Sequence, residues 1–208
     1  MVISTQPTPK FGTVNALLGG VDHAAVDPNN GDVYYVYGNR DAATGHHRRA
    51  IRRIQDNGGG GVTIGPENFV TGQAEAAIPS VAVASDGTVG VFYYTFDGFS
   101  QDNFPIFSAR LAQSTGQGVT FSHEVLLTFL SSAADNGDSR QGVLGDYMQM
   151  KAVGTCFYGA FTGNGVPFGR PFANHDPIFF KACVGSKPRP TPTPRPRPTP
   201  APRPMPPR

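Results

Sequence analysis

The chain has 208 residues, including 26 glycines and 20 prolines but no tryptophan, and only 15% of its residues are charged. This glycine-rich, charge-poor composition is typical of short strands joined by tight turns and argues against long helices. Residues 1–186 carry 11 basic and 15 acidic side chains, whereas residues 187–208 carry six basic and no acidic ones. No stretch approaches the roughly 18 apolar residues of a membrane helix, and no signal peptide is visible in this chain. We expect no transmembrane segment, no nucleic-acid partner and no cofactor.

The first module of the sequence spans about residues 20–72. Two β-rich runs within residues 23–37 flank the turn Asp27-Pro-Asn-Asn-Gly-Asp32 and predict a hairpin. This turn is rich in oxygen ligands but lacks the spacing of a calcium loop, so we interpret it as an ordinary turn and expect no metal site. A strand at 49–55 and a strand at 67–71 complete the predicted unit.

The second module spans about residues 73–130 and repeats the same order of strands. The β-rich runs on either side of Asp86-Gly87 predict a hairpin, because an Asp-Gly pair permits the positive φ angles of a tight turn. A third strand begins at Pro105-Ile-Phe-Ser108, and a fourth covers residues 123–130.

The third module, about residues 140–186, has only three predicted strands. Residues 147–158 predict its hairpin, and Pro177-Ile-Phe-Phe180 matches the third strand of the second module. Residues 10–18 are a candidate for the missing strand, because Thr13-Val-Asn-Ala-Leu-Leu18 precedes the first module as Glu124-Val-Leu-Leu-Thr128 precedes the third.

An internal repeat relates these modules to one another. Gly61-Val-Thr-Ile64 recurs as Gly118-Val-Thr-Phe121, and Val70-Thr71 recurs as Leu127-Thr128, both 57 residues later. Four-stranded units at a period near 60 residues fit the blades of a β-propeller. The predicted fold is therefore all-β, with about three four-stranded antiparallel blades within residues 1–186.

The two cysteines are predicted to form a disulfide within the third module. If Phe161 pairs with Ile178 in antiparallel register, Cys156 lies directly opposite Cys183, and such a pair can reach the Cβ separation of a disulfide. The bond would argue for an oxidising compartment. The alternative is a pair of buried free thiols.

The proline-rich tail, residues 187–208, lies beyond the modules. Its 11 prolines alternate mostly with arginine and threonine, and proline cannot donate to a sheet. We expect a disordered, extended polyproline-II segment. It suits a linker or stalk, or a ligand for an SH3-like partner or an anionic surface.

The turn between the third and fourth strands resembles the Asp-box of sialidases, S-x-D-x-G-x-T-W. Ser114, Gly118 and Thr120 match this motif, whereas Gly116 replaces its aspartate and Phe121 replaces its tryptophan. A weaker copy shares Gly61 and Thr63. Glycine supplies the turn dihedral and the threonine hydroxyl can bond within the turn, so these residues are structural. The chain is thus similar to the sialidase-like propellers, which have six blades.

The resemblance also implies where a site would lie. Sialidase-like enzymes use a tyrosine nucleophile activated by glutamate, an aspartate acid/base and three arginines that clamp a carboxylate, all near the starts of the innermost strands. The corresponding catalytic candidates are Tyr147, Glu75 and Asp146, and the ligand-binding candidates are Arg140, His23 and Ser80.

The sequence departs from the enzymes in two respects. It lacks the Phe/Tyr-Arg-Ile-Pro motif of the first clamp arginine, and it contains only three glutamates. We therefore expect an extracellular or cell-surface module that recognises a glycan or other ligand, or serves as a scaffold, without hydrolysis. The alternative is an exo-sialidase or related glycoside hydrolase that uses Tyr147.

Three blades would leave two blade faces uncovered. Either further N-terminal blades belong to a longer chain, or two copies form a six-bladed homodimer, with 10–18 completing the third blade within one chain or across the dimer.

Overall fold

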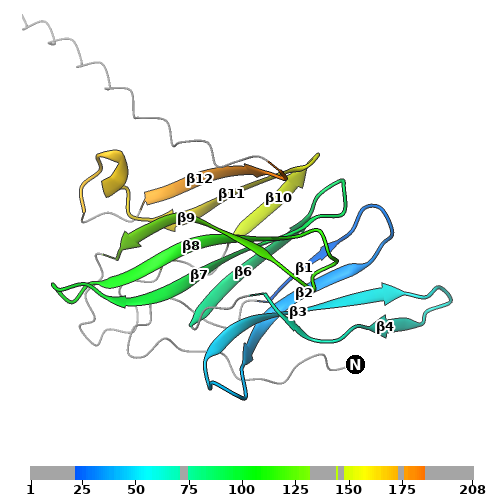
Figure 1. The fold of residues 1–208 in the computed structure, drawn as a ribbon. Helices are drawn as coiled ribbons and strands as arrows, with labels where there is room; N and C mark the ends of the chain where they lie inside the picture. Colours follow the sequence, from blue (N-terminus) through cyan, green and yellow to red (C-terminus); the bar gives the residue numbers. More distant parts are fainter. Residues whose placement is uncertain (1–21, 71–74, 132–143, 145–147, 173–175, 186–208) are drawn as a thin grey trace, which may run out of the picture.

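The computed structural model describes residues 22–70, 75–131, 144, 148–172 and 176–185, shown in colour in Figure 1. These residues form three antiparallel sheets and, apart from a three-residue 3-10 turn at Val166–Phe168, no helix. The predicted all-β class is confirmed. Residues 10–18 and the tail at 187–208 lie outside the described residues. Within the described ranges, no helix is long and apolar enough to cross a membrane.

In sheets 2 and 3 neighbouring strands follow one another along the chain, as in a meander, and sheet 1 has the same order from β1 to β4. Sheet 1 comprises β1 (His23–Val26), β2 (Val33–Arg40), β3 (His47–Asp56), β4 (Val62–Ile64) and β5 (Asn68–Phe69), with β4 and β5 both paired to β3. Sheet 2 comprises β6 (Ala76–Val83), β7 (Val89–Phe99), β8 (Pro105–Ser114) and β9 (Ser122–Leu130). Sheet 3 comprises β10 (Gln149–Val153), β11 (Cys156–Gly163) and β12 (Asp176–Cys183).

The hairpin turns follow from the turn residues of the sequence. Gly31 and Gly87 both have φ of +81°, a conformation that glycine adopts without steric cost. Asp27 Oδ1 accepts hydrogen bonds from the backbone and side chain of Asn29, which satisfies donors inside the first turn. The hairpins therefore form where the sequence places these turns.

Sheet 2 lies between the other two sheets, and both of its faces are buried. Side chains alternate along β7, so that Val91 and Tyr93 face sheet 1 while Phe92 and Tyr94 face sheet 3. The core shared with sheet 1 includes Tyr34, Val36, Ile51, Val81, Val89 and Ala112. The core shared with sheet 3 includes Leu111, Phe129, Met150, Phe157, Phe161 and Phe180.

The first strand of each sheet lies at the centre of the arrangement. All eight residues of β6 are buried, and β6 contacts both β1 and β10 as well as its own hairpin partner β7. Figure 1 shows β6 between the sheet of β1 and the sheet of β10. The three sheets thus extend outward from three adjacent strands.

The predicted disulfide is confirmed. Cys156 is bonded to Cys183, with their Cα atoms 3.9 Å apart. The strand register is also the predicted one, since Phe161 pairs with Ile178 and Cys156 with Cys183. The bond joins the start of β11 to the end of β12 and so fixes the hairpin that ends the described chain.

Removing this bond should destabilise the fold. The bridge closes a loop with a sequence separation of 27 residues, for which the chain-entropy estimate is about 3.5 kcal/mol. We expect Cys156→Ser/Cys183→Ser to lower the free energy of unfolding by about that amount in urea titrations. An unchanged urea midpoint in the double variant would show that the bond does not constrain the unfolded chain.

Sheets 2 and 3 approach closely where glycine faces an aromatic ring. A Cβ at Gly90 would lie 2.6 Å from the ring of Phe157, well inside van der Waals contact. Within sheet 3, Gly159 on β11 lies opposite Phe180 on β12, and a Cβ at Gly159 would lie 2.5 Å from that ring. The two aromatic side chains fill the space that these glycines leave.

We expect Gly90→Ala to destabilise the protein by about 1–3 kcal/mol, because the added methyl group overpacks the core between the sheets. Gly61→Ala is the matched control, since a Cβ there would meet nothing closer than 3.8 Å. Thermal unfolding of both variants measures the difference. Equal stability of the two would contradict the close packing of the sheets.

Candidate binding site at the starts of the innermost strands

The residues predicted to form the site divide into two groups. His23, Ser80 and Glu75 lie in the described part of the chain: His23 begins β1, Glu75 directly precedes β6, and Ser80 is the fifth residue of β6. Arg140, Asp146 and Tyr147 lie outside the described residues. The proximity of Tyr147 to Glu75 or to an arginine therefore stays a prediction.

His23 and Ser80 each accept a hydrogen bond from the backbone of the next innermost strand. His23 Nδ1 accepts from the N–H of Val81 at 3.4 Å, which joins β1 to β6. Ser80 Oγ accepts from the N–H of Met150 at 2.9 Å, which joins β6 to β10. Both residues thus hold neighbouring sheets together.

This repeated contact also aligns the three innermost strands. Val81, which donates to His23, directly follows Ser80 in β6. Met150, which donates to Ser80, is its counterpart in β10 and directly follows Gln149. Gln149 therefore occupies the equivalent position in sheet 3, and Tyr147 lies two residues earlier in the chain. Gln149 is exposed.

Glu75 lies directly before β6 in a strained segment of backbone. It has φ of +57°, Ile78 has φ of +50°, and the register of β6 against β7 shifts between Ala77 and Ser80. The carboxylate of Glu75 is hydrogen-bonded to Nδ1 of His46 at 3.2 Å. Its side chain is therefore engaged with the loop between β2 and β3.

Arg49, on β3, is fully buried beside the start of β6. Its Nε donates a hydrogen bond to the carbonyl oxygen of Ala76 at 3.0 Å. The buried nitrogens Nη1 and Nη2 have no hydrogen-bond partner among the described residues. Gly38 lies opposite Arg49, and a Cβ there would be 2.8 Å from Nη2, so the glycine provides the room for the guanidinium.

The environment of Arg49 disfavours its positive charge. Burial lowers the pKa of its guanidinium to about 10, and the charge of Asp22 only partly offsets this effect. A buried charge without a hydrogen-bonded counterion costs several kcal/mol. A carboxylate would complement the guanidinium with two parallel hydrogen bonds.

The sequence alone did not identify Arg49 as a site residue, because the residues that precede it are polar. His46-His47-Arg48-Arg49 looks like a solvated loop tip, and only the alternation with Ile51 places Arg49 on the face toward sheet 2. Gly38, which lies opposite Arg49 on β2, was the second feature of the sequence that could have indicated a buried guanidinium.

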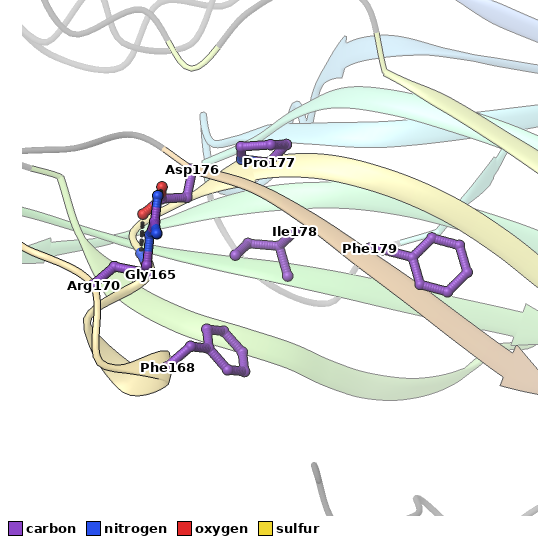
Figure 2. Close-up of a pocket in the computed structure, with 7 residues that line it drawn as sticks. All are labelled: Gly165, Phe168, Arg170, Asp176, Pro177, Ile178 and Phe179. Carbon is purple, nitrogen blue, oxygen red and sulfur yellow. Dashed lines mark hydrogen bonds and ion pairs between the residues drawn. The ribbon is translucent and has the colours of Figure 1, made fainter. Parts of the chain in front are cut away.

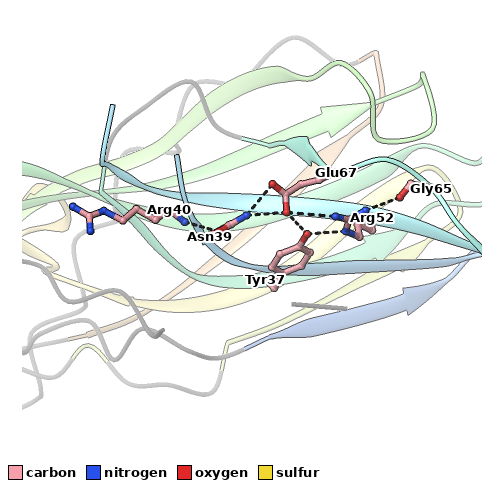
Figure 3. Close-up of polar contacts among 6 residues, drawn as sticks. All are labelled: Tyr37, Asn39, Arg40, Arg52, Gly65 and Glu67. Atoms are coloured by element: carbon pink, nitrogen blue, oxygen red, sulfur yellow. Dashed lines mark hydrogen bonds and ion pairs between the residues drawn. The ribbon is translucent and has the colours of Figure 1, made fainter. Parts of the chain in front are cut away.

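A separate polar network covers part of sheet 1 (Figure 3). The hydroxyl of Tyr37 donates to Glu67, and Asn39 Nδ2 donates to both Glu67 carboxylate oxygens at 2.8 Å. Arg52 Nε donates to the hydroxyl of Tyr37 at 3.0 Å, and its Nη1 donates to the carbonyl oxygen of Gly65 at 2.9 Å.

This network pairs a tyrosine with a glutamate, but it does not activate the tyrosine. Burial and the hydrogen bond to Glu67 raise the pKa of Tyr37 to about 12, whereas a nucleophile requires a lowered pKa. The network fixes the connection between β4 and β5 onto β2 and β3. We assign it a structural role.

The turn that resembles an Asp-box lies between β8 and β9. Ser114 Oγ accepts hydrogen bonds from the N–H groups of Gly116 and Gly118, at 3.2 and 3.0 Å. Gly118 has φ of +79°, Thr120 Oγ1 lies near Gly116, and Phe121 packs against the core shared by sheets 1 and 2. In the weaker copy, Thr63 Oγ1 accepts from Asn57 Nδ2 at 2.8 Å, and Gly61 N–H donates to Gly58.

A hollow of about 390 Å³ lies beside the start of β12 (Figure 2). Its lining is mainly apolar and includes Phe168, Ile178 and Phe179. Nε of Arg170 and Oδ1 of Asp176 lie 3.5 Å apart at its rim. It lies on β12, the third strand of sheet 3, and its lining includes neither His23, Ser80 nor Glu75. Within the described ranges, no cluster of three or more His, Cys, Asp and Glu side chains could hold a metal ion.

No family model matches the chain, and no curated protein matches its sequence.

The hydrogen bond from Val81 to His23, between sheets 1 and 2, predicts that the stability of the fold depends on pH. Burial, and then the charge of Lys151, lower the pKa of His23 below 6.5, and burial and Arg110 lower the pKa of His123. The unfolded chain therefore binds protons that the folded chain does not, and stability should fall as the pH decreases below about 6.5.

His23→Asn should reduce this loss of stability, because the amide can accept from Val81 but cannot be protonated. The measurement is urea unfolding of both proteins at pH 7.5 and pH 5.5. His46→Asn, at an exposed histidine, is the control. An identical pH dependence in wild type and His23→Asn would contradict the assignment.

Proposed function

We propose that the chain is a sialidase-like propeller module that binds a carboxylate-bearing ligand, such as an acidic glycan, without hydrolysing it. The single observation that carries this proposal is the buried guanidinium of Arg49, whose two terminal nitrogens have no hydrogen-bond partner among the described residues. It lies beside the start of an innermost strand, at the end of the sheets where sialidase-like propellers bind their ligands.

The arrangement of the sheets supports the propeller. Three successive meanders extend outward from β1, β6 and β10, and each connects through its first strand to the next sheet. Blades of a propeller have this order and orientation. The proposed fold is thus a set of consecutive blades from one ring.

Two features support binding without hydrolysis. The carboxylates of Glu67 and Glu75 are engaged by Tyr37 and Asn39 and by His46, respectively, and the third glutamate, Glu124, is on β9 at the periphery of sheet 2. The three glutamates are thus either engaged by other side chains or on a peripheral strand.

An extracellular location is part of the proposal. Disulfides persist in oxidising compartments and are rare in the cytosol, and the Cys156–Cys183 bond closes the last described hairpin. The proline-rich tail then suits a stalk that separates the module from its attachment.

Calorimetric titration with N-acetylneuraminic acid and galacturonic acid, with glucose as the neutral control, tests the proposal. We expect an acidic sugar to bind and Arg49→Met to weaken its affinity by about 10- to 150-fold, because charge-assisted hydrogen bonds contribute about 1.5–3 kcal/mol. Arg40→Met removes the same charge from an exposed position and should leave binding unchanged.

The same variant has a second readout. Without ligand, Arg49→Met should raise the free energy of unfolding by about 1–3 kcal/mol, because it replaces an uncompensated buried charge by an apolar side chain. Lower stability together with unchanged affinity would contradict the proposal. Turnover of a fluorogenic sialoside that disappears in Tyr147→Phe would instead establish the exo-sialidase alternative.

A further inference from the structure

We infer that the hollow beside the start of β12 is a second binding site, which takes a small carboxylate that carries an apolar ring, such as an arylalkanoate. The ring enters the hollow, and Arg170 at the rim binds the carboxylate. This site goes beyond the proposed function, because it is built from other residues and holds whether or not Arg49 binds a ligand.

The hollow has the size and lining of a small-molecule site. Its volume is about 390 Å³, and ligand pockets measure about 300–1,000 Å³. Figure 2 shows Phe168, Ile178 and Phe179 around the hollow, with Arg170 and Asp176 together at one side. Phe179 is 68% exposed, so its ring is available to a ligand. Aromatic rings attract one another at centroid separations of about 4.5–7 Å, which favours an apolar ring as the occupant.

The loop at 164–172, which forms one wall of the hollow, is fixed at both ends by Asn164. This side chain is buried, its Oδ1 accepts from the N–H of Val166 at 3.0 Å, and its Nδ2 donates to the carbonyl oxygen of Phe172 at 2.8 Å. The ring of Phe172 contacts that of Phe104 edge to face, with centroids 4.9 Å apart. The loop is therefore held against sheet 2 without a ligand.

Gly165 positions the two charged side chains at the rim. Its carbonyl oxygen accepts from the N–H groups of Phe168 and Arg170, at 2.8 and 3.1 Å, and its own N–H donates to Oδ2 of Asp176 at 3.1 Å. A Cβ at Gly165 would lie 2.6 Å from Cγ of Arg170 and would also collide with Oδ2 of Asp176. The glycine therefore provides the room in which Arg170 and Asp176 lie together.

Arg170 offers hydrogen-bond donors to a ligand. Its side chain is 55% exposed, and its Nε lies 3.5 Å from Oδ1 of Asp176. Among the residues that the structure describes, this ion pair is the only polar contact of the Arg170 side chain. Asp176 thus orients the guanidinium, and the two terminal nitrogens remain available. A carboxylate can accept from both of them in parallel.

The surrounding charges favour a ligand with a single negative charge. Lys151 and Lys181 are exposed on the face of sheet 3 that also carries Phe179. The positive charges near the hollow thus outnumber the one negative charge, that of Asp176. A dianion such as a phosphate monoester would be repelled more strongly by Asp176 than a carboxylate would be.

The lining also distinguishes an arylalkanoate from an acidic sugar. The hydroxyl groups of a sugar ring would face Phe168, Ile178 and Phe179, whose side chains carry no hydrogen-bonding group. Enclosing a hydroxyl group without a partner is unfavourable. The ligand of this hollow therefore differs in chemistry from the acidic glycan proposed for Arg49.

An NMR titration of the full, nitrogen-15-labelled chain with hydrocinnamate tests this inference. We expect saturable shifts of the Gly165 and Arg170 amides, with a dissociation constant on the order of 1 mM for so small a ligand. Hydrocinnamamide has the same ring but no charge, and it should bind at least about 10-fold more weakly. Galacturonic acid has the charge but no apolar ring, and at these two amides it should also bind more weakly.

Two variants test the assigned residues. Arg170→Gln and Phe179→Ser should each weaken hydrocinnamate binding at least about 10-fold. Val153→Ser is the control for Phe179→Ser, because Val153 is 66% exposed on the same face but does not line the hollow. Both replaced side chains are exposed, and the amide spectrum of each variant verifies that the fold is retained.

The absence of saturable shifts at Gly165 would overturn the inference. Equal affinity for the amide, tighter binding of galacturonic acid at this position, or unchanged affinity in both variants would also overturn it. Arg49→Met should leave hydrocinnamate binding unchanged, so the two sites can fail independently. Loss of acidic-sugar binding in Arg49→Met, with hydrocinnamate binding intact, would support both.

Discussion

Burial of β6 on all sides is the constraint on which the rest of the structure depends. All eight of its residues are buried, and it has neighbours in sheets 1 and 3 as well as in its own sheet. Because β6 is the first strand of its sheet, the backbone groups on its edge away from β7 have no strand of that sheet to bond to. His23 addresses this problem for β6, since its Nδ1 accepts the N–H of Val81, and Ser80 does the same for β10, since its Oγ accepts the N–H of Met150.

Glycines make room for three large side chains in the cores between the sheets. Glycines at positions 90 and 159 admit the rings of Phe157 and Phe180, which fill the core between sheets 2 and 3. Gly38 likewise admits a guanidinium between sheets 1 and 2. The first two contacts stabilise the fold by apolar burial, whereas the third encloses a charge. Such an exception to the packing rules is more typical of a functional position than of a structural one.

The sequence predicted local structure well because turns and strand alternation are local properties. The Asp86-Gly87 hairpin and the Cys156–Cys183 register follow from residues that are close in the chain or paired within one module. The burial of Arg49 could not be predicted in this way, because it depends on which face of β3 another sheet covers. The fourth strand of sheet 1 was expected at 67–71, but β5 covers only Asn68–Phe69, and β4 provides the additional pairing with β3. The candidate residues Arg140, Asp146 and Tyr147 lie outside the described part of the chain.

Amide hydrogen exchange at Val81 and Met150 tests most directly whether the innermost strands lie side by side. The account predicts slow exchange at both amides, because each donates to a side chain of the neighbouring sheet. It also predicts that His23→Ala accelerates exchange at Val81 alone and that Ser80→Ala accelerates exchange at Met150 alone. Fast exchange at both amides of the wild-type protein would contradict the arrangement of the three sheets.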